Sequence, residues 1–276
     1  MLKTRVITAL VLMAVLLPIM VSGSTLAFAV VATLFFGAAM WENQRLFKKP
    51  SAVVMALIWS ALFLYISLSN ISLSRPAFPA LFAACILFWC LRLIPSLAYG
   101  LPVLTSFSSG MLSGIYGVCI FGCFVAMITL FFHSPLFLFA AMAIVWIADI
   151  GAYFSGKAFG KRKLAPTISP GKSWEGAIGG WLAVLIIGAA STFISALHDS
   201  VPTKILTESG WLGFVAIMTL LAAASVVGDL FESLLKRRAE MKDSSTLLPG
   251  HGGVLDRIDA LIPVLPIVAL LDFWWR

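Results

Sequence analysis

Apolar runs of about 20 residues recur along the whole of this 276-residue chain, and they limit the folds that it can adopt. Hydrophobic residues make up 61% of the sequence and charged residues only 11%, more apolar surface than a soluble domain of this size would bury. Within a bilayer every backbone polar group needs a partner inside the protein, which leaves helices or a closed barrel. No ten-residue pattern of alternating polarity is present, so the sequence predicts an all-α integral membrane protein.

We expect a polytopic bundle of about nine transmembrane helices. The predicted spans cover residues 6–22, 25–41, 51–70, 77–95, 110–132, 135–150, 176–197, 211–229 and 260–275. The first span, preceded by Lys3 and Arg5, could be a signal peptide. A second apolar span follows at once, which favours an uncleaved anchor. We divide the chain into an N-terminal region of about five spans, residues 1–134, and a catalytic transmembrane region, residues 135–276.

The distribution of Lys and Arg predicts the orientation. One set of alternating segments holds 16 of the 19 basic residues, namely Lys3, Arg5, Arg45, Lys48, Lys49, Arg92, Lys157, Lys161, Arg162, Lys163, Lys172, Lys236, Arg237, Arg238, Lys242 and Arg257. The other set holds Arg75, Lys204 and Arg276. The positive-inside rule therefore predicts a multi-pass protein with a cytoplasmic N-terminus and an outside C-terminus. We expect a bacterial-type inner membrane, with the candidate site on its cytoplasmic face. The net charge of +7 then reflects orientation and anionic lipid or substrate rather than nucleic acid. A homodimer is left open.

The four cysteines all fall inside predicted spans, at positions 85, 90, 119 and 123. They form neither a CxxC pair nor a secreted disulfide framework. We interpret them as small apolar packing residues.

Polar residues gather in two predicted cytoplasmic segments, residues 151–175 and 230–259. Just before the first segment, Asp149 is costly beside lipid and is expected to face the bundle interior or water, although a helix-to-helix hydrogen bond is the alternative. Gly171-Lys172-Ser173 resembles a phosphate cradle, but no Walker pattern is present. Ser173 is also placed to cap the following helix, with Glu175 in its first turn.

The second segment begins with a polar stripe. If the eighth span continues as a helix past Gly228, then Asp229, Glu232, Ser233 and Lys236 lie on one face. An amphipathic helix on the membrane surface is the alternative, but such a helix normally carries lysine and arginine on its wet side, not paired carboxylates.

A glycine-rich stretch from Pro249 to Gly253 follows, and it permits close backbone contact with a ligand. If a helix begins near Val254, Asp256 and Asp259 share one face and suit a divalent cation. Arg257 beside them supplies a permanent positive charge for phosphate. His251 could act as an acid or bind phosphate, although a lone histidine is more often structural.

Carboxylates combined with lysines and arginines at a membrane surface favour magnesium-assisted transfer of a phosphoryl or nucleotidyl group. The order of these residues closely resembles the signature of the phosphatidate cytidylyltransferases, or CDP-diacylglycerol synthases. The matching positions are Ser233, Lys236, Arg237, Lys242, Asp243, Ser245, Leu248, Pro249, His251, Gly252, Gly253, Asp256, Arg257 and Asp259. The resemblance extends to three further stretches, Asp149 to Tyr153, Ser169 to Gly176 and Gly228-Asp229. This sequence departs from the family pattern at Gly171, where a basic residue is expected.

The resemblance implies an enzyme that converts CTP and phosphatidate into CDP-diacylglycerol and pyrophosphate with Mg²⁺. It implies metal ligands at Asp229 and Asp256, with Asp149 and Asp259 as supporting carboxylates. The groups expected to hold the triphosphate and phosphatidate are Lys236, Arg237, Lys242 and Arg257, with Lys172, Ser173, Ser233, Gly252 and Gly253 as further donors and His251 as a catalytic candidate.

Two other functions fit parts of the sequence. Another CTP-dependent lipid enzyme, such as a polyprenol kinase, would transfer the terminal phosphate instead of the nucleotidyl group. A secondary transporter also carries charges within the membrane, but its site is expected near the midplane between paired repeats. Here the charges crowd one face and no repeat is visible. A CDP-alcohol phosphatidyltransferase is disfavoured because its run of spaced aspartates is absent.

Overall fold

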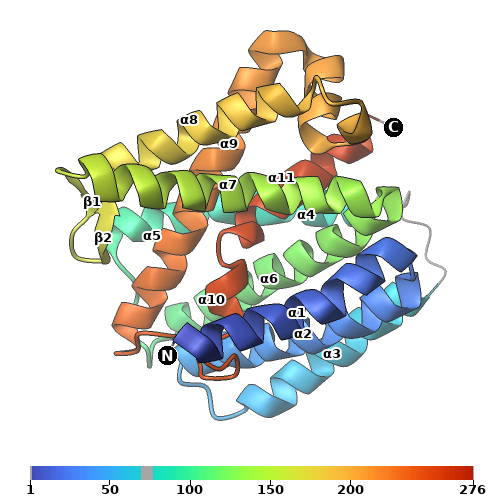
Figure 1. Cartoon of the computed structure of the whole chain (residues 1–276). Coiled ribbons are helices and arrows are strands. Elements are labelled where there is room, and N and C mark those ends of the chain that lie inside the picture. Colours follow the sequence, from blue (N-terminus) through green and yellow to red (C-terminus); the bar gives the residue numbers. More distant parts are fainter. Residues whose placement is uncertain (1, 70–76, 276) are drawn as a thin grey trace.

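The computed structural model describes residues 2–69 and 77–275. They form a bundle of helices with one two-stranded sheet (Figure 1). The elements are α1 (Leu2–Ser22), α2 (Thr25–Leu46), α3 (Ala52–Leu68), α4 (Ala77–Phe88), the π-helical η1 (Trp89–Leu93), α5 (Ile94–Tyr99), α6 (Phe107–His133), α7 (Pro135–Phe159), β1 (Lys163–Ala165), β2 (Ser169–Ser173), α8 (Trp174–Ser191), the 3₁₀ turn η2 (Ser195–Leu197), α9 (Val201–Arg238), α10 (Leu255–Ile258) and α11 (Leu261–Trp274). The predominance of helix agrees with the predicted class.

The described helices include six that are long and apolar enough to cross a membrane. These are α2, the continuous stretch from α4 to α5, and α6, α7, α8 and α9. Three shorter apolar helices, Met13–Ser22, Ala52–Leu68 and Leu261–Trp274, coincide with the remaining expected spans. The chain therefore has the helices of a polytopic membrane protein, while the count of nine spans stays a prediction. Arg75 and Arg276, which entered the orientation argument, lie outside the described residues.

Several predicted boundaries are wrong. Helix α7 continues to Phe159 rather than ending near residue 150, so the first predicted cytoplasmic segment begins as helix. Helix α9 continues past Gly228 to Arg238, as the predicted polar stripe requires. Before the expected eighth span, residues 201–209 are already helical, and the chain changes direction at Gly210, whose φ of 63° suits glycine. Helix α8 ends at Ser191, before the expected residue 197. Hydropathy located the apolar centre of each helix, but polar residues continue a helix as readily as apolar ones.

Helix α6 forms the centre of the bundle. It packs against α2, α4, α7 and α11, and most of its side chains are buried by protein. Phe124 of α6 meets Phe36 of α2 and Phe63 of α3 edge to face. Around the π-helical turn, Trp89 packs against Tyr116 of α6 and both contact Phe231 of α9. These aromatic contacts join the N-terminal helices to α9.

Helices α7 and α8 approach each other closely because small residues face one another along their contact. A Cβ added at Gly151 would lie 2.7 Å from Ala183 Cβ, and one at Gly176 would lie 2.9 Å from Ala152 O. Close backbone approach through small residues is typical of helix pairs in membranes. The pair holds the β1–β2 hairpin, which connects the two helices, at one end of the bundle (Figure 1).

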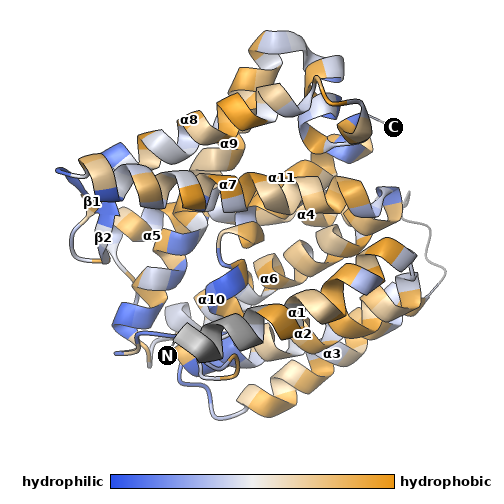
Figure 2. Ribbon diagram, viewed as in Figure 1, coloured by the Kyte–Doolittle hydropathy of each residue, from blue (hydrophilic) through white to orange (hydrophobic). Residues whose placement is uncertain are grey.

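Polar residues concentrate at this end. Figure 2 shows hydrophilic residues on the hairpin, on the last turns of α9 and on α10, while the rest of the bundle is mainly hydrophobic. The segments predicted to carry the chemistry therefore lie in one region, although they come from distant parts of the sequence.

Candidate active site

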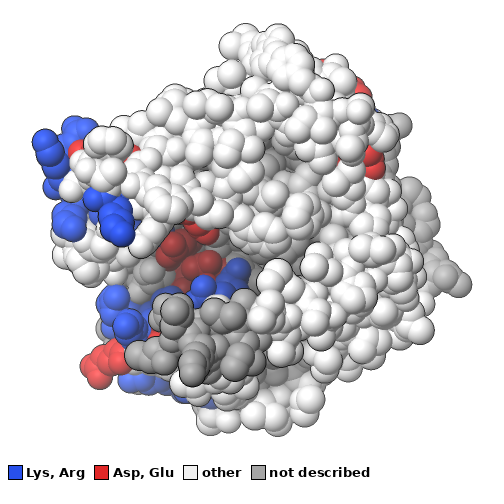
Figure 3. Space-filling view, viewed as in Figure 1, with Lys and Arg blue, Asp and Glu red and all other residues white. Residues whose placement is uncertain are grey.

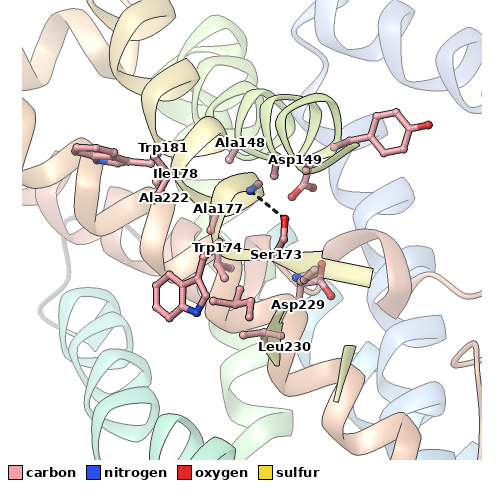
Figure 4. A pocket seen from close by; sticks show the side chains of 18 of the residues that line it. Ala148, Asp149, Ser173, Trp174, Ala177, Ile178, Trp181, Ala222, Asp229 and Leu230 are labelled. Atoms are coloured by element: carbon pink, nitrogen blue, oxygen red, sulfur yellow. Dashed lines mark hydrogen bonds and ion pairs between the residues drawn. The ribbon is translucent and has the colours of Figure 1, made fainter. Parts of the chain in front are cut away.

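A pocket of about 800 Å³ lies between α7, α8, α9 and strand β2. Figure 4 shows Asp149, Ser173 and Asp229 grouped at one part of its wall, with Trp181, Ile178 and Ala222 away from them. The remaining wall is mainly apolar. The pocket therefore combines a long apolar surface with a small polar region.

Asp229 is the centre of this polar region. Its Oδ2 lies 2.5 Å from Lys172 Nζ, and its Oδ1 accepts a hydrogen bond of 3.2 Å from the Ser233 hydroxyl one turn later on α9. Lys172 comes from β2, so this ion pair joins the hairpin to α9. Ser173 caps α8 as predicted, because its Oγ accepts a 3.1 Å hydrogen bond from Gly176 N. Its hydroxyl oxygen is therefore already engaged.

Asp256 lies in a second polar group, formed by α10 and the loop before it. Its Oδ1 lies 2.6 Å from Lys236 Nζ, and Lys236 also pairs with Glu232 on its own helix. Its Oδ2 accepts hydrogen bonds from Gly253 N at 2.7 Å, Ser244 N at 2.9 Å and Ser244 Oγ at 3.0 Å. Burial favours the neutral acid, but the hydrogen bond and charge of Lys236, with the two backbone N–H groups, hold the pKa of Asp256 below its usual value.

Among the described residues, Arg257 makes no ion pair with its neighbour Asp256, which binds Lys236. The Arg257 guanidinium donates instead to the carbonyl of His251, through Nε at 3.0 Å and an Nη at 2.5 Å. The contact closes the glycine-rich loop into a compact turn, in which Gly252 adopts a φ of 85°. His251 Nδ1 is buried without a hydrogen-bond partner among the described residues.

Asp259 follows α10 and interacts electrostatically with both polar groups, through Asp229 and Lys172 in the first and Lys236 in the second. Its partial burial and the nearby charge of Asp229 raise its pKa from the usual 3.8 to about 7. A positive charge placed near Asp259 and Asp229 would stabilise the ionised form of both carboxyl groups.

The other predicted residues are less enclosed. Arg237 is exposed on α9, and its Nε donates a 3.2 Å hydrogen bond to Ile168 O in the hairpin loop. Lys242 is exposed in the loop after α9. At the base of the hairpin, Glu175 accepts hydrogen bonds from the backbone N–H groups of Lys161 and Arg162, each at 3.1 Å. The Arg162 guanidinium also pairs with Glu175, through its Nε at 3.1 Å, so Glu175 anchors the base of the hairpin.

The space-filling view shows where these groups reach the surface. Lys and Arg side chains gather at the end of the molecule that carries the hairpin, around a hollow in which acidic side chains are visible (Figure 3). Anionic substrates would be attracted to this end.

The donor set suits magnesium, although no group of three or more His, Cys, Asp or Glu side chains in the described parts of the chain is arranged to hold a metal. Magnesium usually takes only one or two protein carboxylates and fills its remaining positions with water and substrate phosphate oxygens. Burial and the charge of Asp229 raise the pKa of Asp259 although Lys236 and Lys172 lower it, so added positive charge would stabilise the ionised carboxylates. On these grounds the residues fit the ion.

Sequence reasoning missed Glu42 of α2. Its side chain is fully buried, and its carboxylate accepts hydrogen bonds from both ends of the loop that carries the predicted site. Glu42 directly follows the predicted span 25–41, and a carboxylate at the end of an apolar span is a functional candidate by default. The rule that identified Asp149 would also have identified Glu42.

The whole chain matches known proteins. The model of the cytidylyltransferase family covers residues 3–274. A phosphatidate cytidylyltransferase of Pseudomonas aeruginosa is 38% identical over 98% of this chain and 97% of that protein, and one of Bacillus subtilis is 30% identical over the same shares. The phosphatidate cytidylyltransferase of Haemophilus influenzae is 47% identical over 52% of this chain, and this match spans about half of that relative, 48%. This chain belongs to the cytidylyltransferase family.

Proposed function

We propose that this protein transfers a cytidylyl group from CTP to phosphatidate and releases CDP-diacylglycerol and pyrophosphate. The observation that carries the proposal is the pocket, in which an apolar wall leads to the Lys172–Asp229 ion pair. A phospholipid has the same division between acyl chains and phosphate. The family match and the names of the full-length relatives support this substrate class.

The apolar wall would hold the acyl chains of phosphatidate. Trp181, Ile178 and Leu230 line it, and α7 and α8 are apolar enough to lie in the bilayer. The lipid would enter sideways from the inner leaflet, and CTP would come from the aqueous side. Burial of the chains in the pocket would place the phosphate of the lipid near Lys172.

The positive groups divide into two kinds. Lys172, Lys157 and Arg237 lie around the pocket or on the surface beside it, and are placed to bind phosphate oxygens. Lys236 pairs with Glu232 and Asp256, so its first role is to hold α9 against α10. Arg257 has a comparable role in the glycine-rich loop, where it binds the His251 carbonyl.

We assign magnesium binding to Asp229 and Asp256, with Asp149 and Asp259 as supporting carboxylates. When bound, the ion would neutralise phosphate charge and stabilise the leaving pyrophosphate. Asp229 would then have less need of the Lys172 ammonium, which could turn toward a phosphate. Ser233, which donates to Asp229, orients that carboxylate.

The reaction needs orientation more than proton transfer. One oxygen of the phosphatidate phosphate attacks the α-phosphorus of CTP, the bond from that phosphorus to the β-phosphate bridging oxygen breaks, and pyrophosphate leaves. The attacking oxygen is already anionic near neutral pH, so no strong general base is required. The role of the protein is to align the two phosphates and stabilise the developing charge.

The end that carries the hairpin is proposed to face the cytoplasm, with the N-terminus on the same side. Cysteine substitutions test this in a variant that lacks the four native cysteines. Cysteines that replace Lys161 or Lys242 should be shielded from an impermeant thiol reagent in intact cells, whereas a cysteine that replaces Lys204 should react. The opposite pattern would overturn the orientation.

Nucleotide choice tests the activity itself. Purified protein with phosphatidate should turn over CTP or dCTP but not ATP or GTP. Equal turnover with ATP would contradict the proposal. A polyprenol kinase is the nearest rival, and it would release CDP instead of pyrophosphate. Whether the protein works as a homodimer stays a prediction.

A further inference from the structure

Glu42 connects the N-terminal helices to the loop before α10. It lies near the end of α2, and its side chain is fully buried. Its Oε1 accepts hydrogen bonds from Val254 N at 3.0 Å and from the Ser245 hydroxyl, and its Oε2 accepts from Leu255 N at 2.6 Å and from the Ser244 hydroxyl at 3.1 Å. One carboxylate thus binds both ends of the loop that carries the glycines.

Two of these donors are backbone N–H groups at the beginning of α10, those of Leu255, its first residue, and of Val254, which precedes it. Backbone N–H groups at the beginning of a helix have no carbonyl partner within the helix, and a carboxylate is the acceptor that satisfies them best. Because Val254 N uses one oxygen and Leu255 N uses the other, both oxygens of Glu42 must accept. A glutamine would place its amide N–H₂ against one of these backbone donors in either orientation.

Glu42 also contacts the group that holds Asp256. The Ser244 hydroxyl lies 3.1 Å from Glu42 Oε2 and 3.0 Å from Asp256 Oδ2, so the two carboxylates share it. Gly253 lies between them, and a Cβ at this position would overlap Ser244 Oγ and Glu42 Oε1. The backbone N–H of Gly253 instead donates to Asp256 Oδ2 at 2.7 Å. The positions of Glu42, Ser244, Gly253 and Asp256 therefore depend on one another.

We propose that Glu42 is a positioning residue for cytidylyl transfer, which fixes the Ser244–Asp256 loop so that the Asp256 carboxylate and the glycine backbone face the reacting phosphates. This rests on the proposed function. Glu42 itself does not touch the substrate, since its four hydrogen bonds enclose both carboxylate oxygens in protein. Helix α2 of the N-terminal region thus supplies the side chain that fixes a loop of the C-terminal region.

The role predicts a specific kinetic change. A displaced loop would lower kcat and raise the magnesium concentration needed for half-maximal turnover, because Asp256 is a proposed ligand. The KM for phosphatidate should stay within about twofold, because the lipid pocket is formed by α7, α8, α9 and β2. A misplacement of about 1 Å can reduce a rate by about 10²-fold, so we expect a 10- to 100-fold loss of kcat.

The experiment compares Glu42→Gln with Glu208→Gln, which makes the same chemical change at an exposed glutamate paired with Lys204. Hydrogen exchange of the backbone is measured on the full-length protein in detergent, together with kcat, KM and magnesium dependence per folded molecule. In Glu42→Gln, exchange should accelerate at residues 243–256 and not in α7 or α8, and kcat should fall as stated. Glu208→Gln should match the wild type in every measurement.

Three results would overturn the positioning role. They are unchanged exchange at residues 243–256, exchange that accelerates equally throughout the chain, or a normal kcat and magnesium dependence per folded molecule. If Glu42→Gln does not fold, Ser245→Ala removes one of the four hydrogen bonds and should give the same local change at smaller amplitude. Exchange does not require turnover. An inactive wild-type protein would therefore contradict the proposed function, while the exchange comparison would still decide whether Glu42 holds the loop.

Discussion

The Lys236 ammonium lies 2.6 Å from the Asp256 carboxylate and joins the end of α9 to α10. Lys236 also pairs with Glu232 one turn earlier on α9, so one lysine neutralises two carboxylates. The polar face of α9 and the loop that carries the glycines are therefore one unit before any substrate binds. This unit and the pocket beside Asp229 form the two halves of the candidate site.

The first prediction separates a metal ligand from a structural partner at Asp256. Asp256→Asn places an amide N–H₂ against Lys236 or against the three donors at Oδ2, so stability should fall by about 1 to 3 kcal/mol. Because Asp256 is also a proposed magnesium ligand, turnover per folded molecule should fall about 10²- to 10³-fold, with a changed magnesium requirement. Thermal unfolding in detergent measures the stability, and turnover across magnesium concentrations measures the activity and its magnesium requirement.

Lys236→Met is the matched comparison, because it breaks the same ion pair and keeps the carboxylate. It should lose at least as much stability, because Glu232 and Asp256 both lose their cation, but its turnover should still respond to magnesium. If Asp256→Asn keeps near-normal turnover and an unchanged magnesium requirement, Asp256 is not a ligand.

The second prediction concerns the space at Gly253. Gly253→Ala would force its Cβ into Ser244 Oγ and Glu42 Oε1, so the loop must shift. We expect lower turnover together with a loss of stability of about 1 to 3 kcal/mol. Gly114→Ala is the control, since a Cβ there meets nothing within 4 Å and alanine favours the α6 helix. Equal behaviour of the two variants would show that the loop is not tightly packed.

The third prediction is a dependence on pH. Since the pKa of Asp259 rises from 3.8 to about 7 on folding, the folded protein binds an extra proton between these values. Its contribution to stability is therefore favourable at low pH and is lost as the pH rises from about 4 to 7. Asp259→Asn should be more stable than the wild type at pH 8 in the absence of magnesium, and the gain should vanish near pH 4. Unfolding temperatures of both proteins between pH 4 and pH 8 measure this difference in stability. If Asp259→Asn is less stable than the wild type at pH 8, the pKa shift is contradicted.

The fourth prediction concerns the opposite end of the bundle. His133 at the end of α6 bonds to Asp272 Oδ1 at 2.7 Å and Asp199 Oδ1 at 3.0 Å. These contacts join α6, α11 and the loop before α9, and α7, about 37 Å long, separates them from the hairpin. His133→Phe should cost about 1 to 3 kcal/mol of stability and leave turnover per folded molecule unchanged. A large change in turnover would show that the two ends are coupled.

Local sequence patterns predicted much of the structure correctly. Apolar runs located the helices, because the period and length of such runs are properties of the chain itself. The helical spacing of Asp229 and Ser233 predicted that they share a face, and Ser233 does donate to Asp229. Capping by Ser173 was also predicted correctly, since it depends only on the next three residues.

Contacts between distant segments could not be predicted in this way. Arg257 stands next to Asp256 in the sequence, yet Asp256 binds Lys236 of another helix, because neighbours on a short helix point in different directions. Glu42 lies about 200 positions before Ser244, and only the packing of α2 against α10 brings them together. The end of α7 was misplaced because the polar residues that follow its apolar part, as far as Phe159, continue the helix without any change in backbone preference.

The fate of the phosphates of CTP tests the central claim most directly. Purified protein in detergent with phosphatidate and magnesium would be given CTP labelled at either the α- or the γ-phosphorus, and the lipid and aqueous products would be separated. Cytidylyl transfer predicts that the α-label enters the lipid and the γ-label is recovered in pyrophosphate. Recovery of the γ-label in the lipid, with CDP in the aqueous phase, would show a kinase and contradict the account.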